Sequence, residues 1–166
     1  QPVQLARLVV ESYVRTGRIP KQLPKLPTEL PPRAGAFVTI HKYGQLRGCI
    51  GTTEATRPTL AEEIARNAVS AASDDPRFEP IGKEELPHLV YSVDVLGEAE
   101  LITSEQQLDP RVYGVIVERG MRRGLLLPDL PGIDTAEAQV TLAKRKAGIS
   151  PRQTVTLYRF RVTRYH

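Results

Sequence analysis

The sequence predicts a fold of the α+β class, with a mixed or antiparallel sheet and flanking helices. Strong β formers occur in short runs separated by tight turns, which predicts strands joined by hairpins. Stretches with apolar residues at helical spacing lie between these runs. Helices interspersed among hairpin-connected strands are typical of α+β proteins. The 166 residues suffice for one domain, or for two subdomains that share a core.

A helix and a proline-rich arm are predicted at the start of the chain. Residues 2–16 have apolar side chains at helical spacing, and Gly17 suits the C-terminal cap. Residues 18–34 contain five prolines, which fix φ and bias the preceding residue toward extended structure. This segment is therefore expected to be a stiff arm, and its leucines predict that it packs on the body.

The same two signals predict the remaining elements. Residues 36–50 predict a hairpin, and residues 60–73 predict a helix whose many alanines indicate a close approach to a sheet. Thr59 suits the N-cap of that helix, and Asp134 suits the N-cap of a later one. Residues 89–96 predict a strand with a short continuation to residue 102, and residues 113–127 predict a hairpin. Residues 134–147 predict a helix, and residues 154–164 predict a last strand.

The only cysteine, Cys49, lies in the motif LRGCIG of the first hairpin. We expect Gly44 to be the centre of a three-residue loop, which pairs Thr39 with Cys49 and His41 with Arg47. This register is favoured because it places the aliphatic side chains together on the other face of the hairpin.

The expected register places four polar side chains on one face of the hairpin, which predicts a binding or catalytic site. Its side chains are those of Thr39, His41, Arg47 and Cys49. Arg47, or a protonated His41, would favour the thiolate form of Cys49. Cys49 is therefore a candidate nucleophile and His41 a candidate proton carrier. The guanidinium of Arg47 suits a carboxylate or phosphate, and Gly48 and Gly51 leave room for a ligand near the backbone. The alternative is structural: a packed thiol, a bulge at the glycines and an ion pair at Arg47.

A second candidate position follows the alanine-rich helix. Asp75 and Arg77, in the segment SDDPRFEP, stand at the end of this helix and can line a cleft for a ligand. The alternative is a helix terminator with a local Asp–Arg pair. The charged residues 83–85 predict a solvated turn.

Composition and motifs exclude several classes of function. The net charge is +4, aromatic residues are 5%, and the basic run 144–146 predicts a solvated helix face, which argues against a nucleic-acid partner. Three scattered histidines and the lack of phosphate-loop or dinucleotide motifs predict no metal and no cofactor. No apolar run approaches the roughly 20 residues of a membrane span. A single cysteine favours a reducing, cytoplasmic setting.

The chain resembles a known family along nearly its whole length. The matching stretches, in order, are FVTIHKYGQLRGCIGT, AASDDPRFEP, GLLLPDLPGID, KAGI and VTLYRFRV. They resemble the AMMECR domain family, which includes a protein of the bacterial AmmeMemoRadiSam system. The resemblance implies one domain over residues 1–166, built of a larger and a smaller α/β subdomain with a groove near residues 46–51. It also implies two kinds of partner, a Memo-like protein and a radical SAM protein. The family has no established activity, so no catalytic role carries over.

Two classes of function follow. The first is a cleft that binds a small anionic molecule, with enzymatic activity centred on LRGCIG. The alternative is a non-catalytic regulatory module that binds a protein partner through the same groove. A nucleic-acid-binding regulator ranks below both, because the basic excess is small.

Overall fold

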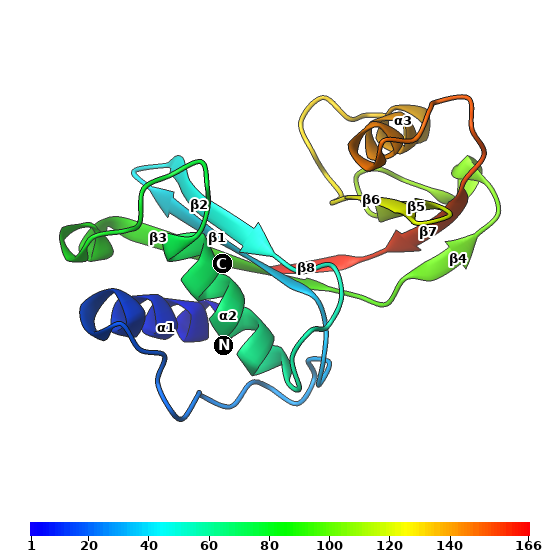
Figure 1. The fold of residues 1–166 in the computed structure, drawn as a ribbon. Helices are drawn as coiled ribbons and strands as arrows, with labels where there is room; N and C mark the ends of the chain where they lie inside the picture. The colour runs from blue at the N-terminus through cyan, green and yellow to red at the C-terminus, as the bar shows by residue number, and fades with distance from the viewer. The chain divides into compact units, whose positions relative to one another are not determined.

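The structure, a computed structural model, describes residues 1–166 and divides into two compact units (Figure 1). The first unit comprises Gln1–Val95 and Thr163–His166, and the second comprises Leu96–Val162. Helices and two four-stranded sheets confirm the predicted α+β class. The elements are α1 (Pro2–Thr16), β1 (Ala36–Lys42), β2 (Gln45–Gly51), α2 (Leu60–Ser73), the 3-10 helix η1 (Lys83–His88), β3 (Leu89–Leu96), β4 (Glu100–Ile102), the 3-10 helix η2 (Glu105–Gln107), β5 (Gly114–Arg119), β6 (Arg122–Leu126), α3 (Ala136–Ala147), β7 (Thr156–Phe160) and β8 (Val162–Tyr165).

The first unit is a sheet with strand order β2-β1-β3-β8 and two helices on one face (Figure 1). The inward residues of β1, Ala36, Val38 and Ile40, are fully buried in the core that α1 and α2 cover. Because side chains alternate along a strand, Thr39 and His41 lie on the opposite face. No helix of this unit covers that outer face (Figure 1).

The close approach of α2 to the sheet was predicted from its alanines and is confirmed. A Cβ atom at Gly48 would collide with the carbonyl oxygen of Ala71, so the helix backbone rests on β2. The predicted N-cap is also confirmed, since Thr59 Oγ1 accepts a hydrogen bond from the Glu62 amide at 3.2 Å.

The first hairpin has a two-residue turn, so the expected three-residue loop is wrong. Tyr43 and Gly44 both have positive φ, 51° and 77°, as a type I′ turn requires. Thr39 pairs with Cys49 as predicted, but His41 pairs with Leu46 instead of Arg47. Arg47 is left as the extra residue of a β-bulge, which restores the register beyond it.

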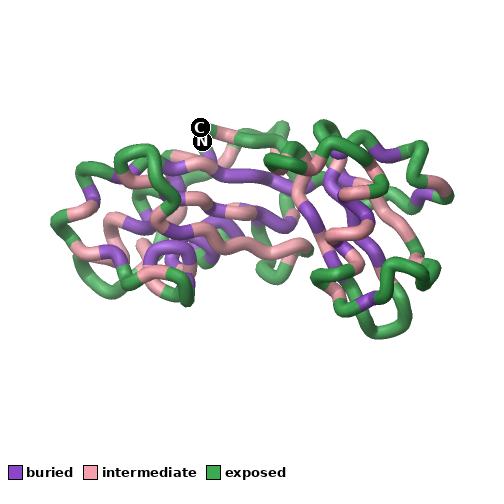
Figure 2. Tube along the Cα trace, turned by 90° about the horizontal axis from the view of Figure 1, so that it is seen from above, coloured by how far each residue is buried: buried purple, intermediate pink, exposed green.

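Residues 18–34 follow α1 without regular secondary structure. Three of their leucines are half-buried and pack against the core of the first unit. Figure 2 shows the buried residues concentrated along the strands and helices, with exposed residues in the connections. The leucines are Leu23, Leu26 and Leu30.

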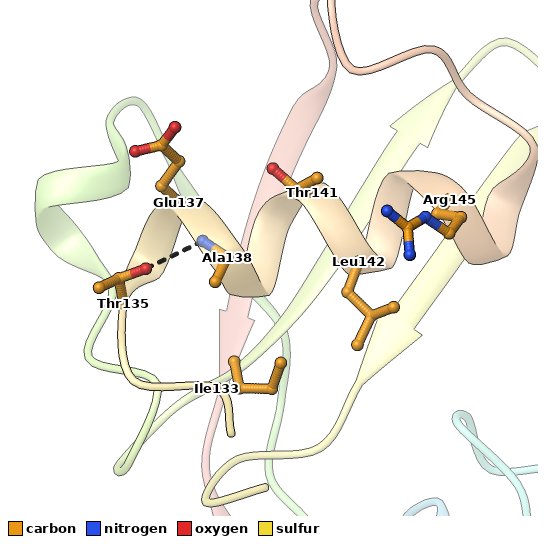
Figure 3. Close-up of a pocket in the computed structure, with 7 residues that line it drawn as sticks. All are labelled: Ile133, Thr135, Glu137, Ala138, Thr141, Leu142 and Arg145. Atoms are coloured by element: carbon orange, nitrogen blue, oxygen red, sulfur yellow. Dashed lines mark hydrogen bonds between the residues drawn. The ribbon is translucent and has the colours of Figure 1, made fainter. Parts of the chain in front are cut away.

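The second unit is a sheet with strand order β4-β7-β5-β6, packed against α3. Val115, Val117, Leu126 and Val140 are buried between the sheet and the helix. The helix begins one residue later than predicted, because Thr135 and not Asp134 is its N-cap. The Thr135 Oγ1 atom accepts a hydrogen bond from the Ala138 amide at 3.1 Å (Figure 3).

Two predicted strands each prove to be two strands in different sheets. The predicted strand 154–164 divides into β7 and β8, and the predicted continuation of 89–96 is β4, in the second sheet. The sheet to which each half belongs depends on the strand with which it forms hydrogen bonds, and local β propensity does not specify that strand. No helix is long and apolar enough to cross a membrane.

Candidate functional site

The thiol of Cys49 lies on the outer face of the first sheet. It is half-buried, and its Sγ atom lies 3.2 Å from the hydroxyl oxygen of Thr39 on the neighbouring strand. The structure therefore brings these two predicted site residues together, as the register implied.

The backbone of Cys49 is held by Asp75 and Arg77, which we call the Cys49 clamp. The Cys49 amide donates to Asp75 Oδ2 at 3.0 Å, and Arg77 Nη2 donates to the Cys49 carbonyl at 3.3 Å. Because β2 is an edge strand, these groups have no strand partner on that side. The clamp satisfies both and closes the sheet edge at Cys49.

The carboxylate of Asp75 is buried and fully engaged. It accepts hydrogen bonds from Arg77 Nε at 3.0 Å and Nη2 at 2.8 Å, and from the Arg77 amide at 3.1 Å, besides that of Cys49. These bonds, first that of the Arg77 side chain, hold the pKa of Asp75 well below its usual range against the opposing effect of burial. Asp75 therefore stays ionised at neutral pH, where it acts as an acceptor.

Arg47 points away from Cys49, contrary to the predicted cluster with Thr39 and His41. Its guanidinium donates to both carboxylate oxygens of Glu85, at 2.9 and 3.1 Å, and to the Glu79 carbonyl at 2.8 Å. The physical reason is the bulge, which removes Arg47 from the register that would place it opposite His41. The arginine beside Cys49 is Arg77, from a segment distant in sequence.

Glu85 is a structural ion-pair residue that the sequence interpretation missed. The predicted solvated turn is the helix η1, and Glu85 Oε1 also accepts a hydrogen bond from Lys42 Nζ at 3.0 Å. Its oxygen Oε2 accepts one from the Gly82 amide at 2.8 Å. Hydrogen bonding from Arg47 lowers the pKa of Glu85 to about 2, from an ordinary value of 4.5.

This lowered pKa predicts acid sensitivity of the first unit. A carboxylate whose pKa is lower in the folded state stabilises the fold above its unfolded pKa, and this contribution disappears as pH falls through the folded pKa. We expect stability to fall between pH 4.5 and about 2, with roughly 2 kcal/mol from Glu85 after allowance for screening. Urea unfolding across this range should show a smaller loss for Glu85→Gln. An equal loss in the variant would contradict the assignment; Glu84→Gln, an exposed neighbour, is the control.

The outer face continues from Cys49 into an apolar surface. His41 is flanked by its two strand partners, Leu46 and Val90, whose side chains are 39% and 62% exposed. Beyond them, the ring of Tyr43, 71% exposed, lies 5.1 Å from the ring of His88. We call these five residues the outer row. The strand register places His41, Leu46 and Val90 side by side, and Tyr43 and His88 follow them at the end of the hairpin and the start of β3.

Glu63 is a second carboxylate that the sequence interpretation missed. It is buried on α2 and accepts hydrogen bonds from the Thr52 and Thr56 hydroxyls and from the Thr56 and Arg57 amides. Burial raises its pKa, but these four hydrogen bonds outweigh burial and lower it overall. Glu63 thus fixes the loop before α2. Its position one helical turn after the apolar Leu60, which places both side chains on one face of α2, was the available signal.

The described chain, residues 1–166, contains no group of three or more His, Cys, Asp or Glu side chains placed to hold a metal ion. His41 has Val90 and Leu46 as its strand partners, and neither is a metal ligand.

Comparison with known proteins gives the family. The AMMECR1 family profile matches residues 3–165, and the chain belongs to this family. A protein of Thermotoga maritima is 51% identical over 98% of this chain and 95% of its own length. A protein of Clostridium acetobutylicum is 46% identical over 98% of this chain, which spans 35% of that longer protein. The crystal structure of an uncharacterized Pyrococcus horikoshii protein matches 98% of this chain and 88% of that one, with 34% identity and a TM-score of 0.85.

Proposed function

We propose that this protein is a binding module that docks a protein partner on the outer face of its first sheet. The observation that carries the proposal is the outer row, an exposed group of apolar and aromatic side chains on a face that no helix of that unit covers. Contiguous exposed apolar patches mark interaction sites more often than isolated apolar residues do. The clamp occupies the sheet edge at Cys49, so the partner would contact the face and not extend the sheet there.

The length of the Clostridium acetobutylicum relative supports a module that works beside another protein. In that relative the matching region is 35% of the chain, so the domain is joined there to further sequence in the same polypeptide. The partners that the family resemblance implies, a Memo-like protein and a radical SAM protein, are the first to test.

Binding of a small anion at Cys49 has less support from the geometry. Arg77, the arginine beside Cys49, already binds the carboxylate of Asp75, and Arg47 points away from Cys49 and binds that of Glu85. The hydrogen-bond partner of Sγ is the Thr39 hydroxyl, which is too weak a base to take a proton from the thiol. Thiol chemistry stays a prediction that one variant separates from docking: Cys49→Ser should leave partner affinity unchanged, whereas an enzyme using the thiol would lose its activity.

The docking proposal predicts that a charge on the outer row disrupts the complex. We expect Val90→Asp to weaken binding of the purified Memo-like or radical SAM protein at least tenfold, because a carboxylate must lose its water at an apolar contact. Isothermal titration calorimetry measures the affinity. The matched control is Leu8→Asp, which changes a 41% exposed leucine on α1. Equal weakening by both variants, or no binding of either protein, would refute the proposal.

A further inference from the structure

A second site lies in the first unit, away from Cys49, between the proline-rich arm and α2. The arm and the helix line a half-open cavity of about 530 Å³. This volume is within the range of small-molecule sites. The first observation is the wall, which is aliphatic: half-buried Ile19, Leu23 and Leu26 from the arm, and Ala61 and Ala65 from the helix.

The second observation is the charge around this wall. Four cationic side chains line the cavity and only one carboxylate does, that of Glu62. None of these five charged side chains forms an ion pair within residues 1–166. The four cations are Lys21, Lys25, Arg57 and Arg66. An excess of positive over negative side chains around one cavity favours an anionic occupant.

Both sides of the cavity are held in place before any ligand arrives. Pro20 and Pro24 restrict the arm backbone. On the other side, the Arg57 amide donates to the buried Glu63 at 3.0 Å, and the Arg57 carbonyl accepts from Arg33 Nε at 3.0 Å. The N-terminal end of α2, which starts beside Thr59, adds a positive helix dipole. Little ordering is therefore needed on binding.

The geometry points to a small amphipathic anion with an aliphatic body, of the medium-chain carboxylate class. The aliphatic wall accommodates the chain, and the cations accommodate the carboxylate. A nucleotide fits less well, because no aromatic side chain lines the cavity for a base to stack on. Another hollow of similar size, about 500 Å³ on α3, has an apolar floor of Ile133 and Leu142 (Figure 3). Its single cation, Arg145, is balanced by Glu137, so it lacks the excess charge.

Titration with octanoate, followed by amide NMR, tests this inference. We expect saturable shifts at Leu23, Ala61 and Ala65, and affinity at least tenfold higher than for acetate, inorganic phosphate or octylamine. Acetate and phosphate carry charge without the chain, and octylamine carries the chain with the opposite charge. Equal binding of octylamine, or equal binding of the short anions, would overturn the inference.

A pair of matched double variants tests the location. Arg57→Gln with Arg66→Gln should weaken octanoate binding at least tenfold. Arg111→Gln with Arg152→Gln removes the same charge from two exposed arginines of the second unit, and binding should stay unchanged. Urea unfolding of the first pair checks that the fold is intact. Equal effects of the two pairs would refute the site, and docking of a protein partner on the outer row does not depend on this result.

Discussion

Replacing Asp75 by alanine is expected to lower the free energy of unfolding by roughly 2–3 kcal/mol, because the Asp75 side chain is buried while that of its partner Arg77 is 55% exposed and water weakens the pair. The carboxylate is 4% exposed and accepts four hydrogen bonds, three from Arg77 and one from the Cys49 amide. Alanine removes all four and leaves the edge of β2 uncovered at Cys49. Urea unfolding of the whole chain measures the loss, and local hydrogen exchange of the Cys49 amide should rise with it.

The neighbouring residue provides a matched control for this variant. Asp74 is exposed at the end of α2, and its side chain makes no hydrogen bond in the structure, so Asp74→Ala should cost less than about 0.5 kcal/mol. Asp75→Asn should lie between the two, because an amide oxygen can still accept the Cys49 bond but no longer carries the charge that Arg77 requires. Similar stabilities of the two alanine variants would mean that the clamp contributes little.

The clamp gives a physical reason for two matching stretches of the family resemblance to occur together. The segment LRGCIG supplies an edge strand with an unpaired amide and carbonyl at Cys49, and the segment SDDPRFEP supplies the acceptor and donor that bind them. The separation of 26 residues between Cys49 and Asp75 is spanned by the loop before α2 and by α2 itself. Asp75 and Arg77 are thus explained by backbone satisfaction without any ligand.

The pairing of Thr39 with Cys49 could be predicted because polarity alternates along both strands. A bulge at the glycines was the alternative interpretation, and the register has one beside Gly48, but the sequence did not indicate that Arg47 is its extra residue or that Leu46 moves to the outer face. The turn was misjudged for a related reason. Tyr43 adopts a positive φ of 51° that its residue type does not favour, so the sequence lacked the usual Asn-Gly or Asp-Gly signal.

The local Asp75–Arg77 pair and an ion pair at Arg47 were both offered as alternatives by the sequence, but the partner of Arg47 was not. Arg47 and Glu85 are 38 residues apart, and no local spacing links them. Once Arg47 leaves the register, its guanidinium reaches the segment around η1, where a carboxylate and two backbone carbonyls receive it. Similarly, Lys21 and Arg66 meet at one cavity only because the arm turns back along α2. Contacts between residues so far apart in sequence can be identified only once the three-dimensional fold is known.

Substituting Gly48 by alanine is the second variant with a large expected effect, a loss of about 3 kcal/mol, the upper end of the usual range for overpacking. The new methyl group would collide with the Ala71 carbonyl oxygen, which belongs to the backbone of α2 and cannot rotate away. The helix must therefore lift from β2, which opens the core around Ile40 and Ile64. Urea unfolding measures the loss.

Gly44→Ala distinguishes this collision from the ordinary cost of replacing a glycine in this hairpin. Gly44 has φ +77°, and a methyl group added there would meet nothing within 4 Å, so alanine incurs only backbone strain of about 1 kcal/mol. If Gly48→Ala cost no more than Gly44→Ala, the helix could shift without losing its core contacts. A larger cost at Gly48 would mean that the sheet requires a bare backbone under α2, because the same contact that fixes the helix also fixes the strand that carries Cys49.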